Sequence, residues 1–214
     1  IRTLVESGVS ALIVNPVDPY SLTDVLESTS EKSIPVISYD KLIRDTADIN
    51  YYAAFDMRAI GNQIAGQIVK DKDLDKAREE HQSYTIEFLM GSPDNEHDLF
   101  LCNGIFEKLQ EYIDDGTLVC KSGKTSFDDT GIMRGSNEAA RNNMDSVLTD
   151  FYSDEKTPDI ICTASDSFSD EVIKLLEDRG LEPGSEEWPM ITGFGSEVQA
   201  VKNVAEGKLS FTVY

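Results

Sequence analysis

The sequence predicts an α/β fold in which parallel strands alternate with helices that cover the sheets. Short apolar runs alternate with amphipathic stretches of helical period along the 214 residues, and glycines such as Gly8 and Gly180 stand where helices are expected to end. Hydrophobic residues make up 40% of the chain, which is typical of globular proteins, and no apolar run approaches the roughly 20 residues of a membrane-spanning helix.

The first part of the chain predicts three strands and two helices. Apolar runs predict strands at 11–15, 34–40 and 51–56. Residues 19–32 predict a helix with Leu22, Val25 and Leu26 on one face. A second helix is predicted after Asp56, a candidate N-cap, with an apolar face made of Ile60, Ile64 and Ile68.

The rest of the chain repeats the strand–helix pattern. Residues 70–81 mix charges and predict a solvated helix end or loop. Four apolar runs predict strands at 84–90, 118–121, 160–164 and 190–192, and amphipathic helices lie between them. One of these helices has apolar residues from Phe168 to Leu176 at helical spacing and ends at Gly180. An alternating run at 209–214 predicts a last strand.

Two lobes are expected. Residues 41–50 join two strands without an amphipathic helix, and a new series of strand–helix units opens at Asp56. We therefore expect residues 1–56 to be the remnant of an amino-terminal α/β lobe, residues 57–208 a carboxy-terminal lobe, and residues 209–214 a strand that returns to the first lobe. Both ends of the sequence fall inside predicted elements, so we expect a piece of a longer protein.

The charge disfavours several kinds of partner. The chain has 40 acidic and 19 basic residues, a net charge of −21. Binding to nucleic acid, or to an anionic membrane, needs clustered cations. We expect neither partner.

Chemistry at a metal or a catalytic nucleophile is not expected either. Cys102, Cys120 and Cys162 form no C-x-x-C pair, so zinc is unlikely and the thiols are expected to be buried and inert. The sequence has no G-x-S-x-G, P-loop or H-E-x-x-H motif, and Gly193-Phe194-Gly195 lacks the third glycine of a dinucleotide-binding loop. We expect a protein that is not an enzyme and that needs no cofactor.

Polar residues at the ends of the predicted strands are the candidate site, because ligands of parallel sheets bind beyond the carboxyl ends of the strands. The residues found there are amides, carboxylates, hydroxyls, a lysine and an aromatic ring: Asp40, Lys41, Asn95, Ser165, Asp166 and Phe194, with His97 close by. Carboxylates and amides can each bind two neighbouring hydroxyls, and aromatic rings pack against sugar C–H groups. This mixture suits a sugar.

Simpler roles compete with ligand binding at several of these positions. Asp166 and Asp56 could be helix N-caps and nothing more, and Asp40 could be an ordinary turn residue. His97 could be solvated in an acidic first helical turn.

Several segments resemble the periplasmic sugar-binding proteins of ABC importers, above all the xylose-binding and multiple-sugar-binding branch. The segments are GVSALIVNPVD (8–18), IPVISYDKLI (34–43), YYAAFD (51–56), GSPDN (91–95), YIDDG (112–116), MITG (190–193) and FTVY (211–214). They occur in the family's order over essentially the whole chain.

The resemblance implies a two-lobe type I periplasmic-binding-protein fold, with an incomplete amino-terminal lobe, that closes on a monosaccharide and delivers it to an ABC permease. It implies sugar contacts from the Asp40–Lys41 pair, from Asn95 and His97, and from Ser165–Asp166, and hinge crossings near Asp56 and Lys208. It also implies a periplasmic or extracellular location, with a lipid anchor as one option, and a sensor kinase as a partner in some members.

The sequence departs from the family where Phe194-Gly195 replaces the usual Gln-Asp pair. Loss of that carboxylate disfavours the usual aldose and favours a less hydroxylated or charged ligand. The alternative function is an effector-sensing domain of a LacI-type regulator. The charge of −21 and the stretch SYDKLI favour transport, and the segment that precedes residue 1 would decide: a basic helix-turn-helix or a signal or lipoprotein peptide.

Overall fold

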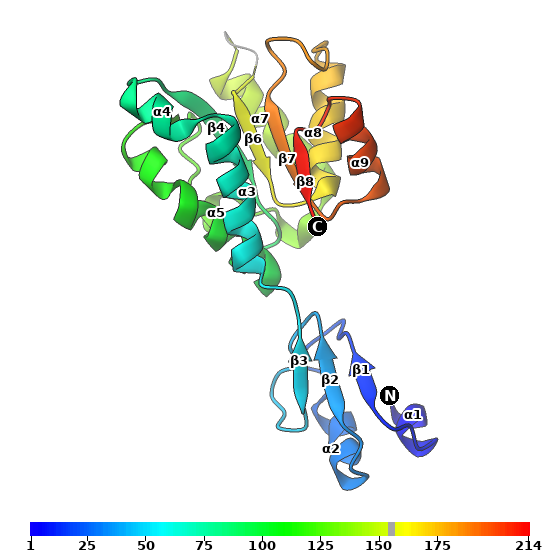
Figure 1. Ribbon diagram of the computed structural model, residues 1–214. Coiled ribbons are helices and arrows are strands. Elements are labelled where there is room, and N and C mark those ends of the chain that lie inside the picture. Colours follow the sequence, from blue (N-terminus) through cyan, green and yellow to red (C-terminus); the bar gives the residue numbers. More distant parts are fainter. Residues whose placement is uncertain (154–156) are drawn as a thin grey trace. The chain divides into compact units, whose positions relative to one another are not determined.

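A computed structural model describes residues 1–153 and 157–214 and divides the chain into two compact units, residues 1–56 and 57–214 (Figure 1). Each unit contains one parallel sheet with its own hydrophobic core. The α/β class predicted from the alternating pattern is therefore confirmed. No helix in the described part of the chain combines the length and the apolar character that crossing a bilayer requires.

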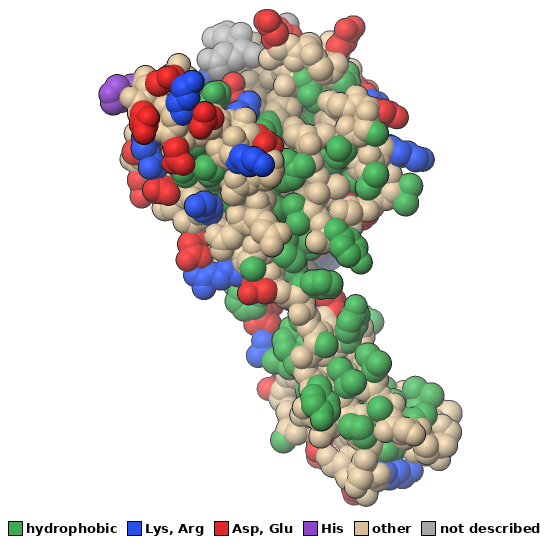
Figure 2. Space-filling model, viewed as in Figure 1, with side chains coloured by type: hydrophobic (Ala, Val, Ile, Leu, Met, Phe, Trp, Pro, Cys, Tyr) green, Lys and Arg blue, Asp and Glu red, His purple; other side chains and the backbone are tan. Residues whose placement is uncertain are grey.

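The first unit has a three-stranded parallel sheet in the order β1-β2-β3. Its elements are α1 (Arg2–Glu6), β1 (Leu12–Val14), α2 (Thr23–Glu31), β2 (Val36–Tyr39) and β3 (Tyr51–Ala53). Its small core comprises Val5, Leu12, Leu26, Ile34, Val36 and Ile43. Side chains alternate across a strand, so Ile13 and its register neighbours Ile37 and Tyr51 fall on the other face, where Ile13 is 70% exposed. On the face seen in Figure 2, many hydrophobic side chains are exposed on this unit.

The second unit has a five-stranded, all-parallel sheet in the order β5-β4-β6-β7-β8. Its strands are β4 (Tyr84–Leu89), β5 (Leu118–Val119), β6 (Ile160–Thr163), β7 (Met190–Phe194) and β8 (Phe211–Val213). Its helices are α3 (Met57–Asp71), α4 (Leu74–Glu79), α5 (Glu96–Asp114), α6 (Phe127–Thr130), the 3-10 turn η1 (Met133–Gly135), α7 (Asn137–Phe151), α8 (Asp166–Asp178) and α9 (Val198–Ala205).

Helices cover both faces of this sheet, as Figure 1 shows. One core joins α3 and α5 to alternate strand residues such as Ile86 and Phe88, and the other joins α7 and α8 to Leu89 and Ile161. All four residues of β6 are buried, because this central strand is covered on both sides. The predicted pattern of continuous apolar strands is the consequence of this two-sided cover.

Helices α3 and α5 approach each other so closely that only glycine fits at two positions. A Cβ at Gly61 would lie 2.1 Å from the carbonyl oxygen of Leu101, and a Cβ at Gly104 would lie 2.1 Å from that of Arg58. Outside this contact, Arg58 and Glu107 form an ion pair at 2.8 Å. The two helices therefore pack as one closely fitted layer that shares a core with β4.

Three sequence expectations differ from the structure. Residues 70–81 contain α4, with Leu74 and Ala77 buried one helical turn apart, so this segment is more than a solvated end. Positively and negatively charged side chains lie side by side over α4 in Figure 2. These many charged residues made the apolar pair hard to recognise in the sequence. The predicted strand at 51–56 pairs only at Tyr51–Ala53. Residues 209–214 were expected to be a strand that returns to the first lobe; β8 (Phe211–Val213) pairs with β7 and is part of the second unit.

Candidate functional site

The candidate site of the second unit lies at the carboxyl edge of its sheet. Strands β4, β6 and β7 are adjacent and parallel, so the loops that follow them leave the sheet side by side. The predicted residues lie at or just beyond these strand ends: Asn95 and His97 after β4, Ser165 and Asp166 after β6, and Phe194 as the last residue of β7. The topology therefore brings together side chains that are separated by up to a hundred residues in the sequence.

The loop after β4 is fixed by its own polar groups. Asp98 accepts a hydrogen bond from the backbone N–H of Ser92 at 2.7 Å. Asn95 is the N-cap of α5, and its side-chain oxygen accepts from the backbone N–H of His97 at 3.2 Å. Asn95 and His97 are half-buried at the start of a 19-residue helix. Asn95 thus has a structural role, capping, in addition to its predicted contact with ligand.

A second segment, which no pattern in the sequence predicted, lies against this loop. Met90 bridges to Gly131, and the backbone N–H of Ile132 donates to the carbonyl of Gly91 at 2.9 Å. The backbone N–H of Arg134 then donates to the hydroxyl of Ser92 at 3.0 Å. Arg134 is exposed, has a left-handed backbone with φ 58°, and has no ion-pair partner within the described parts of the chain. It is a candidate that sequence analysis missed, because residues 131–135 follow no strand.

The end of β6 leads directly into α8. Ser165 is the N-cap, and its hydroxyl accepts from the backbone N–H of Phe168 at 3.3 Å. Asp166 is the first residue of the helix and is only 2% exposed. Its Oδ1 accepts from the hydroxyl of Thr212 and its Oδ2 from the backbone N–H of Glu197, both at 2.7 Å. The cap expected at Asp166 is therefore made by Ser165, and the Asp166 carboxylate bonds to other elements.

The end of β7 carries the aromatic ring. Phe194 is half-buried and packs against the core that α3 and α5 share with the sheet. The next residue, Gly195, is exposed, and its backbone N–H donates to the carbonyl of Val213 at 2.9 Å. With glycine here, this strand end contributes a ring and backbone groups but no carboxylate.

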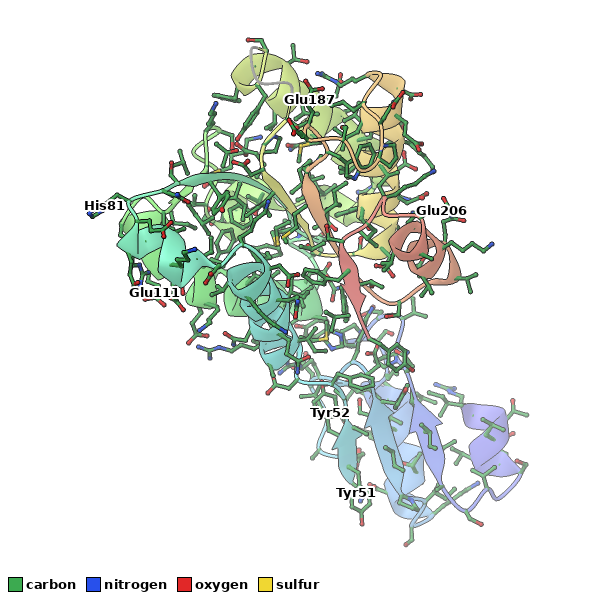
Figure 3. The ribbon with its side chains drawn as sticks, turned by 45° about the horizontal axis from the view of Figure 1, so that its top comes forward. Tyr51, Tyr52, His81, Glu111, Glu187 and Glu206 are labelled. Carbon is green, nitrogen blue, oxygen red and sulfur yellow. The ribbon has the colours of Figure 1, made fainter. Side chains whose placement is uncertain are left out.

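In the first unit, the predicted pair Asp40–Lys41 follows β2. Asp40 has a left-handed backbone with φ 66°, and its N–H donates to the carbonyl of Ala53 at 2.8 Å. Tyr52, labelled in Figure 3, donates its hydroxyl to the carbonyl of Asp40 at 3.2 Å. The hydroxyl of Ser38 donates to the carbonyl of Lys41 at 2.6 Å. These bonds hold the backbone of the turn and leave both side chains half-exposed.

The two predicted hinge residues have different surroundings. Asp56 is exposed and directly precedes α3. Lys208 pairs with Glu177 at 2.9 Å and with Glu206 at 3.4 Å, and hydrogen bonding to Glu177 raises the pKa of its ammonium group. Their hinge role stays a prediction.

The thiols are shielded. Cys102 and Cys162 are fully buried and Cys120 is half-buried. Burial raises the pKa of Cys120 to about 11 and that of Cys162 to about 12. Within residues 1–153 and 157–214, no three His, Cys, Asp or Glu side chains gather as they would around a metal ion. His81 lies beyond the end of α4, away from the sheet, in Figure 3.

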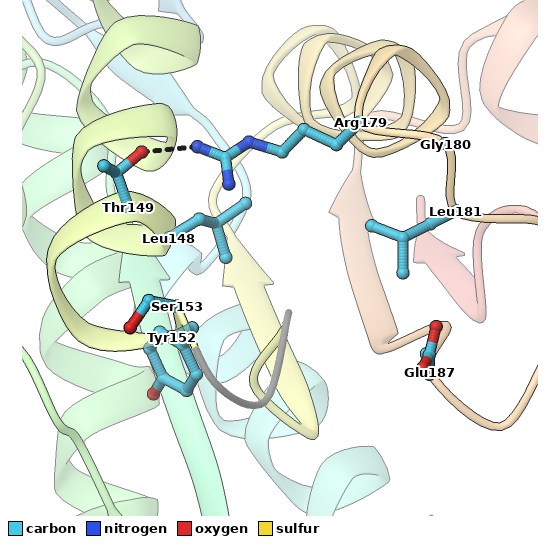
Figure 4. A pocket seen from close by; sticks show the side chains of 8 residues that line it. All are labelled: Leu148, Thr149, Tyr152, Ser153, Arg179, Gly180, Leu181 and Glu187. Carbon is cyan, nitrogen blue, oxygen red and sulfur yellow. Dashed lines mark hydrogen bonds between the residues drawn. The ribbon is translucent and has the colours of Figure 1, made fainter.

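A cavity of about 370 Å³ lies elsewhere in the second unit (Figure 4). Its lining includes Leu148 and Tyr152 near the end of α7, Arg179 and Leu181 just after α8, and Glu187 before β7. Helices return antiparallel to the strands, so this cavity is at the amino edge of the sheet, opposite the candidate site. Arg179 is already bound to Asp145 at 2.8 Å and to Thr149 at 2.6 Å.

Comparison with known proteins shows that the chain is similar to periplasmic sugar-binding proteins. It is 32% identical over its whole length to the multiple sugar-binding periplasmic receptor ChvE of Rhizobium radiobacter and 27% identical to the D-xylose-binding periplasmic protein of Escherichia coli. The chain spans 59% and 58% of these relatives. A solved ABC transporter solute-binding protein from Clostridium phytofermentans, with bound β-D-glucose, is 30% identical and superposes with a TM-score of 0.81, covering 98% of this chain and 63% of that one.

The resemblance to periplasmic sugar-binding proteins seen in the sequence segments is thereby confirmed. The profile of the periplasmic binding protein domain matches residues 1–214, so the chain belongs to the periplasmic binding protein domain family.

Proposed function

We propose that this chain is the larger part of an extracytoplasmic solute-binding protein that captures a monosaccharide and delivers it to an ABC importer. The observation that carries the proposal is the set of half-buried polar side chains at the carboxyl edge of the second unit's sheet, in a chain whose whole length matches a family of binding proteins. Binding is non-covalent, so specificity comes from the hydrogen bonds that replace water around the sugar.

The proposed ligand contacts are the half-exposed groups at the strand ends. They are Asp40 and Lys41 in the first unit and Asn95, His97, Ser165 and Phe194 in the second. Lys41 has no ion-pair partner among the described residues, so its ammonium group is available to a ligand. Phe194 would pack against the C–H face of the sugar ring.

Calorimetric titration of the full-length protein with D-glucose, D-xylose, D-allose and D-glucuronate tests the proposal. We expect saturable binding of at least one of these sugars. Replacing Lys41 by Ala should weaken that binding roughly tenfold, because a charge-assisted hydrogen bond is lost. The matched control is Lys108→Ala, an exposed lysine in the middle of α5, which should bind as the wild type does. Absence of binding across the panel would contradict the proposal.

The cellular setting follows from the same function. The curated relatives are named as periplasmic proteins, and this supports a periplasmic location for the present protein. The importer's permease is the partner that such a role requires. The lipid anchor and the sensor kinase of the sequence analysis stay predictions. The sugar-binding relatives favour transport over a LacI-type regulator.

A further inference from the structure

Asp166 is the one residue of the predicted ligand set that is buried, with 2% of its surface exposed. Neither of the two roles expected from the sequence accounts for its contacts. Ser165 makes the helix cap, and both Asp166 carboxylate oxygens accept hydrogen bonds from within the second unit. A buried carboxylate is stable only with such partners, so the groups that supply them are tied to its position.

The partners come from two further segments. Thr212 of β8 donates its hydroxyl to Oδ1, and the same hydroxyl oxygen accepts from the backbone N–H of Ser196 at 3.1 Å. Glu197, just before α9, donates its backbone N–H to Oδ2. One carboxylate thus joins the start of α8, the loop at 195–197 and strand β8. We call this set of contacts the Asp166 clasp.

Two glycines provide the space for the clasp. A Cβ at Gly193 would lie 2.4 Å from Oδ1 of Asp166, closer than non-bonded atoms approach. A Cβ at Gly195 would lie 3.3 Å from Oδ2, and Gly195 has φ 128°, a backbone conformation that favours glycine. The glycine found in place of the expected carboxylate at the end of β7 therefore adjoins another carboxylate that is already there.

We propose that Asp166 is a positioning residue rather than a ligand contact. Its clasp holds the loop after β7 and strand β8 against the start of α8, and so keeps Phe194 and Ser165 in the arrangement that receives the sugar. The effect on sugar binding rests on the function proposed above; the clasp itself does not.

Hydrogen exchange of the full-length protein tests the clasp directly. Asp166→Ala and Thr212→Val remove opposite ends of one hydrogen bond, and Gly193→Ala displaces the carboxylate sterically. In all three variants we expect the amides of Ser196 and Glu197 to exchange roughly tenfold faster or more, with β4 and β6 unchanged. Asp178→Asn is the matched control, because this aspartate of the same helix is 70% exposed and pairs with Arg141. Unchanged exchange in Asp166→Ala and Thr212→Val would overturn the proposal.

Measurements of sugar affinity distinguish a positioning role of Asp166 from a direct contact with the ligand. We expect Thr212→Val and Gly193→Ala to weaken binding of the best sugar of the panel roughly tenfold, like Asp166→Ala. Loss of affinity confined to Asp166→Ala, with Thr212→Val binding normally, would make Asp166 a ligand contact and contradict the proposal. If Asp166→Ala fails to fold, the other two variants still decide. If the wild type binds no sugar, the proposed function fails, and the exchange experiment still tests the clasp.

Discussion

Asp40 and Asp166 occupy equivalent places, each just after an apolar strand of a parallel sheet, yet the structure uses them differently. Asp40 is half-exposed, and the hydroxyls of Ser38 and Tyr52 donate to backbone carbonyls of its turn. Asp166 is buried, and its carboxylate accepts hydrogen bonds from the Thr212 hydroxyl and the Glu197 backbone N–H. A carboxylate at a strand end can therefore be part of the fold, as at Asp166, or stay half-exposed, as at Asp40, where a ligand contact is proposed.

The surroundings differ for a physical reason. The chain after Asp40 continues as an irregular loop, and its left-handed φ of 66° is one that aspartate tolerates better than most residues. The chain after Asp166 turns into a helix that packs beside β7, where Gly193 leaves room for a carboxylate. Burial then requires that each oxygen has a donor.

The largest expected effect is the difference between removing the two carboxylates. Asp166→Ala leaves the hydroxyl of Thr212 and the N–H of Glu197 without their partner, so the free energy of unfolding should fall by about 2–4 kcal/mol. Asp40→Ala should change it by less than about 1 kcal/mol. Urea unfolding followed by circular dichroism measures both. Equal losses of stability in the two variants would contradict the different roles assigned to Asp40 and Asp166.

A smaller effect should distinguish what the backbone conformation of Asp40 contributes to stability from what its side chain contributes to sugar binding. Asp40→Val places a β-branched residue at φ 66° and should lower the free energy of unfolding by about 1–2 kcal/mol. Asp40→Gly suits that conformation and should stay within about 0.5 kcal/mol of the wild type while weakening sugar binding. The control is Asp45→Gly, because Asp45 is also left-handed, with φ 57°, but follows no strand. Asp45→Gly should bind sugar normally; weakened binding in this control would contradict a specific role for Asp40.

Asp115 is an intermediate case, since it is partly exposed and yet accepts several hydrogen bonds. Its carboxylate accepts from the hydroxyl of Thr117 at 2.7 Å and from the N–H of Thr117 at 2.9 Å, and Arg78 lies beside it. These hydrogen bonds, led by that of the Thr117 hydroxyl, lower the pKa of Asp115. The unfolded chain therefore binds the proton more readily, and the stabilisation is present above the ordinary value of about 4 and lost as the pH falls through the lower folded value.

Comparison of Asp115→Asn with the wild type at two pH values tests this sign. The variant should unfold at lower urea concentration than the wild type at pH 6, and the gap should close towards pH 2. A gap that widens in acid would contradict the assignment.

The smallest expected effect is in the reactivity of the three cysteine thiols. Because burial raises the pKa of all three cysteines, iodoacetamide at pH 8 should label them slowly in the folded protein. Half-buried Cys120 should react first and Cys162 later, as peptide mass spectrometry would show. Rapid labelling of Cys162 would mean that the core around β6 opens.

The sequence predicted the strands and the α/β class because buried parallel strands are continuous apolar runs. It located the strand-end polar residues for the same reason. It could not predict that Arg134 joins Ser92, because that contact depends on a bridge between Met90 and Gly131. Nor could it show that Asp166 bonds to Thr212, 46 residues later. Local patterns record which residues end a strand, whereas such contacts depend on how separate loops pack.

A crystal structure of the full-length protein with its bound sugar tests the central claim most directly. We predict that Asp40, Lys41, His97 and Ser165 lie within hydrogen-bond distance of the sugar hydroxyls and that Phe194 packs against the ring. Asp166 should still be bonded to Thr212 and Glu197 and should not touch the ligand. A sugar bound away from these strand ends, or gripped by the Asp166 carboxylate, would contradict the account.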